Sequence, residues 1–119
     1  MNAAFAEAYN SGEIEQLLAF YEPDALLAPL PGRRARGEAA IREALAGLLA
    51  LKGRMTSANN YCMQVGDLAL LQGEWHLSGT GSDGEPIEQR SRTAELVRRQ
   101  PDGSWLYLID HPYADDDRS

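Results

Sequence analysis

The sequence predicts an α+β domain in which three N-terminal helices cover one face of a curved antiparallel sheet. Apolar residues recur at helical spacing as far as Lys52, whereas from Met55 onward no helical period fits. The strands expected after Met55 are joined by short connections, such as Gly66-Asp67, which make neighbouring strands antiparallel. Helices first and strands afterwards is the order typical of this fold class.

Two helices are expected near the N-terminus. Residues 3–10 place Phe5 and Tyr9 on one face of a short helix, which Asn-Ser-Gly at positions 10–12 brings to an end. Ser11 suits the N-cap of a second helix, and Pro23 predicts its end. The apolar stripe of this second helix consists of Ile14, Leu17, Leu18 and Tyr21.

The middle of the chain predicts a weak strand and a longer helix. The run Asp24–Leu30 is interrupted and followed by prolines, so we expect an irregular or edge strand, and a basic turn spans Gly32–Gly37. A third helix is expected over Glu38–Lys52, with a glycine directly after it as the stop signal. Four strands should follow, at Met55–Val65, Leu68–Ser78, Glu88–Arg99 and Trp105–His111.

The last expected strand is apolar on both faces, which predicts a central position with cover on both sides. Successive strand residues leave opposite faces, so strict alternation separates Asp110 from His111. One face would carry Trp105, Tyr107, Ile109 and His111, and the other Leu106, Leu108 and Asp110.

Length and composition restrict the class of protein. The 119 residues are enough for one core, expected as a single domain over residues 1–114 with a disordered acidic tail at 115–119. A net charge of −7 argues against nucleic acid as a partner, because neutralising phosphates requires a basic face. Cys62 has no second cysteine to pair with. With neither a signal peptide nor a membrane-spanning run in sight, we expect a cytoplasmic protein without membrane contact.

Four stretches taken together resemble a known superfamily: AYNSGEIEQLLAFYEPDALLAPLPG, RGEAAIREAL, GDLALLQGEWHLSGTG and RRQPDGSWLYLIDHPY. They are similar to the nuclear transport factor 2-like superfamily, and within it to small bacterial SnoaL-like and ketosteroid-isomerase-like proteins, over residues 3–113. The resemblance implies a cone-shaped α+β barrel that wraps the long helix and leaves a pocket for a small apolar ligand. It also implies a homodimer through the outer sheet face, where Leu106 and Leu108 need a cover.

Asp110 and His111 are the first candidate catalytic residues. The resemblance implies an acid/base carboxylate on a late strand, a position that Asp110 matches. Alternation, however, favours His111 in the pocket and Asp110 outside it, unless a bulge re-aims one of the two. A structural bond from Asp110 to a turn or to a dimer mate is the alternative.

Glu95 and Arg92 are the next candidates, because both lie in the strand segment RSRTAELVRR. Either alternating set of that segment is compatible with the inner face. A carboxylate inside an apolar pocket would have a raised pKa and could act as a general acid or base. The alternative for both residues is a cross-strand ion pair. His76 alternates with apolar neighbours on the polar side of its strand, which predicts a surface role.

Aromatic and apolar strand residues are expected to form the pocket wall. Trp75, Tyr107 and Ile109 are the central candidates, Tyr61 is a further one, and Arg92 is the polar candidate. Plain core packing is the alternative for the aromatic residues. The two histidines lack metal-ligand spacing, so we expect no metal, and no cofactor-binding motif is present.

Two function classes remain open at this point. One is a cofactor-free acid/base enzyme of the isomerase, cyclase or hydrolase type that acts on an apolar carbonyl compound. The other is a module that only binds a ligand or a partner. A fold hosts many functions, so the discriminating feature is the site. Two or more ionisable groups that converge in the pocket would favour the enzyme, and one or none would favour binding alone.

Overall fold

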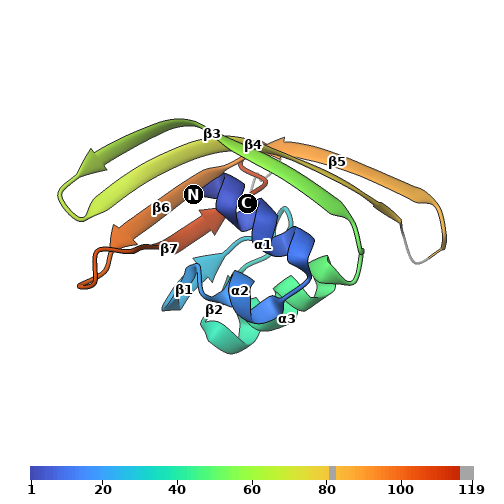
Figure 1. Cartoon of the computed structure of the whole chain (residues 1–119), viewed down its shortest axis with the longest axis horizontal. Coiled ribbons are helices and arrows are strands. Elements are labelled where there is room, and N and C mark those ends of the chain that lie inside the picture. Colours follow the sequence, from blue (N-terminus) through green and yellow to red (C-terminus); the bar gives the residue numbers. More distant parts are fainter. Residues whose placement is uncertain (81–82, 116–119) are drawn as a thin grey trace.

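The structure, a computed structural model, describes residues 1–80 and 83–115, and it has helices on one side of a single curved sheet (Figure 1). The helices are α1 (Asn2–Ser11), α2 (Ile14–Leu18) and α3 (Glu38–Leu49). The strands are β1 (Tyr21–Leu27), β2 (Ala35–Arg36), β3 (Arg54–Val65), β4 (Leu68–Thr80), β5 (Pro86–Arg92), β6 (Ala94–Arg99) and β7 (Trp105–His111). The tail expected at residues 115–119 lies outside the described residues, apart from Asp115.

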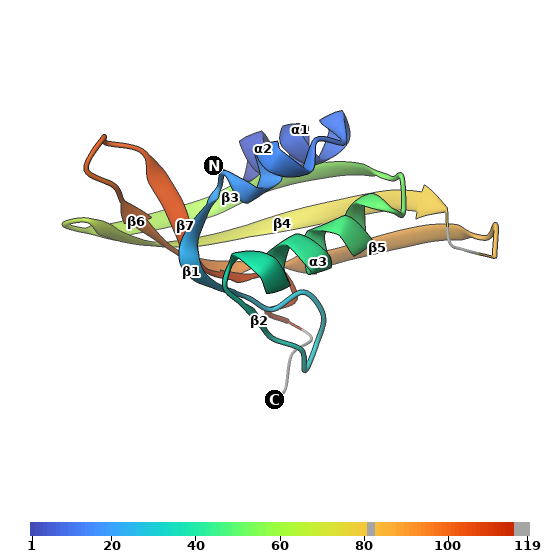
Figure 2. The same cartoon turned by 90° about the horizontal axis from the view of Figure 1, so that it is seen from below.

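The sheet is mostly antiparallel and does not close into a barrel. Its strand order is β2-β1-β7-β6-β4-β3, and β5 pairs with the far half of β4. β1 runs parallel to β7, whereas the other pairs are antiparallel. In the view from below, α3 runs in nearly the same direction as β4 and β5, and β1 and β7 cross at one end (Figure 2). The helix contacts β1 and β2. The predicted α+β class, with helices on one face of a curved sheet, is confirmed.

The two longer helices follow the sequence signals closely. Gly12 ends α1 in the left-handed conformation, with φ 78°, a geometry that costs glycine nothing. α3 begins where expected but ends at Leu49, because the turn after Ala50 places Lys52 at φ 50°. Ile41 and Leu45 on the inner face of α3 are buried against the sheet.

The second helix is shorter than predicted, and Tyr21 belongs to β1 rather than to a helical stripe. Tyr21 pairs with Tyr107 of β7 and is buried there, so tertiary pairing overrides the local helical pattern. Pro23 lies inside β1, in the stretch where the register between β1 and β7 shifts. An irregular stretch tolerates a residue without an N–H group.

The predicted strand Glu88–Arg99 is divided at Thr93 into β5 and β6. The pairing register with β4 is the same on both sides, with Arg92 opposite Glu74 and Glu95 opposite Leu71. At the division, the Gly73 N–H group donates to the Thr93 hydroxyl at 2.9 Å instead of to a backbone carbonyl. The Thr93 hydroxyl thereby replaces one backbone carbonyl as an acceptor between the strands, and Thr93 is buried.

A bulge in β7 changes which side chains face inward. Val97 pairs with Tyr107 and Leu96 pairs with Ile109, so Leu108 is an extra residue in β7. Because of this insertion, Tyr107 and Asp110 are both buried, whereas Ile109 is 40% exposed. Strict alternation over Trp105–His111 is therefore wrong beyond Tyr107.

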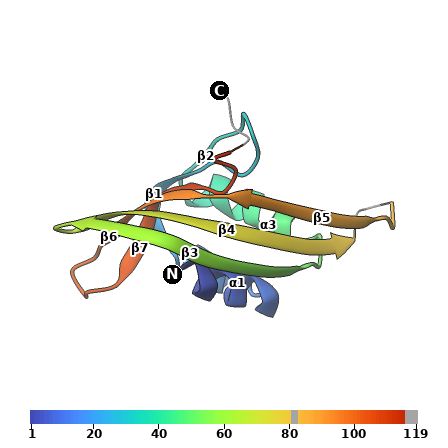
Figure 3. The same cartoon turned by 90° about the horizontal axis from the view of Figure 1, so that it is seen from above.

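The outer face of the sheet has no helix over it among the described residues (Figure 3). Apolar side chains on it are exposed, including Met63, Val65, Leu68 and Leu70. In the described part of the chain, no helix has the length and apolar character needed to cross a membrane.

Candidate functional site

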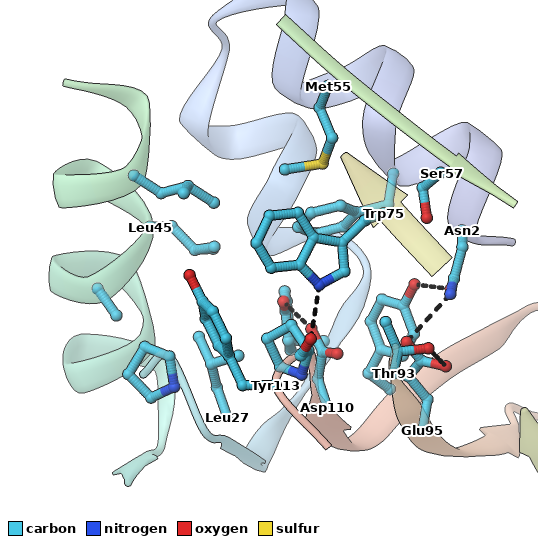
Figure 4. A pocket seen from close by; sticks show the side chains of 17 residues that line it. Asn2, Leu27, Leu45, Met55, Ser57, Trp75, Thr93, Glu95, Asp110 and Tyr113 are labelled. Carbon is cyan, nitrogen blue, oxygen red and sulfur yellow. Dashed lines mark hydrogen bonds between the residues drawn. The ribbon is translucent and has the colours of Figure 1, made fainter. Parts of the chain in front are cut away.

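A cavity of about 90 Å³ lies between the concave face of the sheet and helices α1 and α3 (Figure 4). One water molecule needs only about 10–15 Å³, so this space can hold a small ligand or several waters. Its lining residues are Asn2, Phe5, Tyr21, Leu27, Pro29, Ala44, Leu45, Leu48, Met55, Ser57, Trp75, Thr93, Glu95, Tyr107, Asp110, Pro112 and Tyr113.

The apolar wall is built by helix and sheet together. Leu45 and Leu48 project from α3 because they lie three residues apart on one helical face. Met55 of β3 and Trp75 of β4 close the cavity from the sheet, and Leu27 contributes from β1. These side chains surround the polar groups with apolar surface, which removes them from bulk water.

Trp75 is held in place by the segment that follows β7. Its indole N–H donates to the carbonyl of Pro112, and the ring of Tyr113 packs edge-on against it, with centroids 5.2 Å apart. The Tyr113 hydroxyl donates to Gln89 on β5, and the Ala114 N–H donates to the carbonyl of Arg92. The segment is therefore tied across one edge of the cavity.

Glu95 is a buried carboxyl group with both oxygens hydrogen bonded. Because Thr93 accepts from the Gly73 N–H, its own hydroxyl hydrogen is available to Glu95 Oε1, at 2.9 Å. Asn2 accepts from the Tyr107 hydroxyl at 2.7 Å and donates through Nδ2 to Glu95 Oε2 at 3.0 Å. A proton on Glu95 must therefore occupy a lone pair that neither Thr93 nor Asn2 uses.

Asp110 is the second buried carboxyl group, and it lies directly across the ladder from Glu95. The Tyr21 hydroxyl donates to Asp110 Oδ2 at 2.6 Å. Asp110 Oδ1 accepts no hydrogen bond from any described residue, so one oxygen is open to a ligand. The β7 bulge brings the two carboxyl groups into the same cavity, and a pair of opposite residues has its Cβ atoms about 5 Å apart.

Burial raises the pKa of both carboxyl groups, and the nearby Asp110 raises that of Glu95 further. The pKa of Glu95 rises to about 8, because it is buried and lies near Asp110, although the bonds from Thr93 and Asn2 oppose the rise. Burial raises the pKa of Asp110 to about 6, against the effect of the Tyr21 hydrogen bond. The pair therefore titrates together and holds one proton between about pH 6 and 8.

The structure brings four of the predicted site residues together. Glu95 and Asp110 supply the carboxyl groups, while Trp75 and Tyr107 form part of the wall. Burial also raises the pKa of the Tyr107 and Tyr21 hydroxyls well above the usual value, so both stay protonated as hydrogen-bond donors.

Four other predicted residues lie outside the cavity lining. Ile109 faces outward, and His111 does not line the cavity, because the bulge shifts the alternation by one residue. Tyr61 is 44% exposed on the outer side of β3, opposite Gln72. Arg92 is exposed and forms an ion pair with Glu74, the cross-strand alternative considered for it. His76 lies at the surface, bonded to Glu88, as predicted.

Sequence reasoning missed the three residues that donate hydrogen bonds to the two carboxyl groups, namely Asn2, Tyr21 and Thr93. Asn2 was assigned no role, because nothing local indicates that α1 delivers its first side chain to the sheet. Tyr21 was assigned to a helix, and Thr93 was only one member of an ambiguous alternation. The sequence shows that Ser91, Thr93, Glu95 and Val97 share one face of the strand, but not whether that face points into the cavity. Had the inward face been known, Thr93 would have been a candidate.

Within residues 1–80 and 83–115, the structure contains no cluster of three metal-ligating side chains of histidine, cysteine, aspartate or glutamate.

Comparison with models of known protein families identifies the family of this chain. The family model described as a SnoaL-like domain matches residues 2–108. The chain belongs to the SnoaL-like domain family. The resemblance of the sequence to SnoaL-like proteins is thereby confirmed. A comparison with curated proteins finds no match.

Solved structures of other proteins have the same fold. A ketosteroid isomerase-like protein from Erwinia carotovora atroseptica is 22% identical, with a TM-score of 0.78 over 90% of this chain and 85% of the other. A candidate dehydratase of the nuclear transport factor 2-like family from Streptomyces avermitilis is 22% identical, with a TM-score of 0.74 over 92% and 88%. A Caulobacter vibrioides protein with a cystatin-like fold is 18% identical, with a TM-score of 0.77 over 92% and 81%. At these identities the likeness shows the fold.

Proposed function

We propose that this SnoaL-like protein is a cofactor-free acid/base enzyme that moves a proton at the carbon next to a carbonyl group of a small apolar compound. The observation that carries the proposal is the pair Glu95 and Asp110, two buried carboxyl groups that lie opposite each other and converge on one cavity. Their raised pKa values are consistent with one proton on the pair near neutral pH. Carboxyl groups with divergent pKa values are suited to act as an acid and a base at the same pH.

The reaction needs one ionised and one protonated carboxyl group. The ionised member takes the proton from the carbon, and the electrons of the broken C–H bond form the enol double bond. The protonated member gives its proton to the carbonyl oxygen, and the reverse transfers return a proton to carbon. The apolar wall, with Leu45 and Trp75 among its members, excludes water and strengthens these charge interactions. The ketosteroid isomerase-like and candidate dehydratase neighbours are compatible with such chemistry.

A ligand-binding protein without chemistry is the second candidate. The specific observation in its favour is that both oxygens of Glu95 already accept hydrogen bonds from the protein, from Thr93 and Asn2. Such a carboxyl group can serve to fix the fold around a cavity.

Deuterium exchange separates the two candidates. Cyclopentanone is incubated with the protein in D₂O, and the loss of its α-proton signals is followed by NMR. An enzyme should accelerate exchange, with a bell-shaped dependence between about pH 6 and 8. Asp110→Asn and Glu95→Gln should each lower the rate by about 10²–10⁴-fold.

The matched control is Glu88→Gln, which removes a surface carboxylate and should leave exchange unchanged. Exchange no faster than in buffer, together with weaker ketone binding in Trp75→Ala, would instead identify a binding protein. A homodimer is expected for either candidate.

A further inference from the structure

The charges of the cavity are all of one sign. Glu95 and Asp110 line it, and no lysine, arginine or histidine is among the described lining residues. The groups that act on the two carboxyl groups from the surrounding elements are each other, the hydroxyls of Tyr21 and Tyr107, and the N-terminal ammonium of Met1. That ammonium lies at the surface and is bonded to Asn59. A negative charge inside the cavity therefore has no cation beside it.

A buried charge without a counter-charge is unfavourable, and a ligand can supply the missing partner. Asp110 Oδ1 accepts no hydrogen bond from a described residue, so it is open to a donor on a ligand. The aromatic residues Phe5, Trp75 and Tyr107 also line the cavity and are available to a cationic ligand. The face of an aromatic ring attracts an ammonium group, and most strongly where water is excluded.

We propose that the cavity takes a small protonated amine, whose ammonium group lies between Glu95 and Asp110 and whose apolar part packs against Trp75 and Leu45. The same charges exclude anions: a carboxylate or phosphate would meet two carboxyl groups and no basic side chain. A volume of about 90 Å³ restricts the ligand to a small molecule. The proposal uses the site of the proposed reaction but does not depend on a reaction taking place.

Proton linkage follows from this arrangement. The pair holds one proton between about pH 6 and 8, and an ammonium group favours the fully ionised pair. Binding should therefore release a proton, and the affinity should increase as the pH rises through this range. Above about pH 10 the amine itself loses its charge and the affinity should fall again.

Three probes of one shape test the proposal: cyclopentylamine, cyclopentanol and cyclopentanecarboxylate. Each is titrated into the full chain at neutral pH, and binding is followed by the NMR signal of the Trp75 indole N–H. Cyclopentylamine should bind about tenfold more tightly than the alcohol, and the carboxylate should not bind. Asp110→Asn should remove most of the preference for the amine, because Asp110 is the ionised member of the pair at neutral pH and has the open oxygen. Glu88→Gln on the outer face should retain the preference.

Cyclopentanol binding as tightly as cyclopentylamine, or binding of the carboxylate, would overturn the proposal. An amine affinity of the wild-type protein that does not rise between about pH 6 and 8 would overturn it as well, without recourse to any variant. The outcome is separate from that of the cyclopentanone experiment. Ketone exchange without an amine preference would support the proposed reaction and reject the amine site. An amine preference without exchange would support the amine site and reject the reaction.

Discussion

Glu95 shows how one buried side chain links the stability of the fold to its chemistry. Its pKa of about 8 means that the folded protein keeps a proton that the unfolded chain, with an ordinary value of 4.5, releases. A carboxyl group with a raised pKa supports the fold fully below the unfolded value, and this support is lost as the pH rises through the folded value. The burial that prepares Glu95 for proton transfer therefore weakens the protein at alkaline pH.

Glu95→Gln should remove this weakness. At about pH 9 the variant should exceed the wild type in free energy of unfolding by on the order of a few kcal/mol, since each pKa unit corresponds to about 1.4 kcal/mol. At about pH 5, where Glu95 is protonated in the folded state, the two proteins should differ by less than about 1 kcal/mol. Urea unfolding at both pH values measures the effect. Glu88→Gln serves as the control, and an equal difference at both pH values for Glu95→Gln would contradict the argument.

At the scale of elements, two glycines on different elements should respond to the same substitution in opposite ways. Gly47 lies inside α3, and a methyl group added there meets no atom within 4 Å. Gly73 lies in β4, where an added Cβ would come within 2.3 Å of the Ala58 carbonyl and 3.0 Å of Asn2 Nδ2. The close approach of β3 to β4 thus depends on glycine at position 73.

Gly47→Ala should stabilise the protein by about 0.5–1 kcal/mol, because alanine favours helix where glycine does not. Gly73→Ala should destabilise it by about 1–3 kcal/mol, because the backbone must shift. It should also disturb the Asn2 bond to Glu95, which a changed NMR titration of the Glu95 carboxyl carbon would report. Thermal unfolding compares the two variants, and a Gly73→Ala protein as stable as the wild type would refute the close approach.

The elements also show what the sequence can and cannot predict. Helix and strand periodicity, with glycine and proline as stop signals, was sufficient for α1, α3, β3, β4 and the order of layers. The start of β1 at Tyr21 was not predictable, because its cause is a parallel pairing with β7 that lies about 85 residues away in sequence. The bulge at Leu108 cannot be predicted from a continuous run of apolar residues. It nevertheless determines that Asp110, and not His111, reaches the cavity. Glu95 is a candidate from the sequence because either alternating set of its strand segment can face inward, where a carboxyl group would have a raised pKa.

At the scale of the whole molecule, the helices of the described residues cover one of the two faces of the sheet. The cross-strand pairs Met63–Leu70 and Leu96–Ile109 lie side by side on the outer face, and Leu70 is also opposite Leu96. Leu106, predicted earlier to need a cover, pairs with Arg98 nearby and is half-buried, as is Leu108. The exposed apolar row therefore extends beyond the two leucines named from the sequence, toward β3.

We expect this row to be the contact surface of a homodimer, in which the same face of two copies packs together. Burial of each large apolar side chain contributes about 1.5–3 kcal/mol, so two charged substitutions per chain should abolish the contact. Met63→Lys with Leu70→Lys should therefore give monomers in light scattering, and Leu106→Lys with Leu108→Lys should do the same if the contact reaches β7.

Leu30→Lys is the matched control, because Leu30 is 47% exposed but lies in the loop after β1. A dimer mass that persists in both double variants would place the contact elsewhere, and a wild-type monomer would remove the expectation of a dimer altogether.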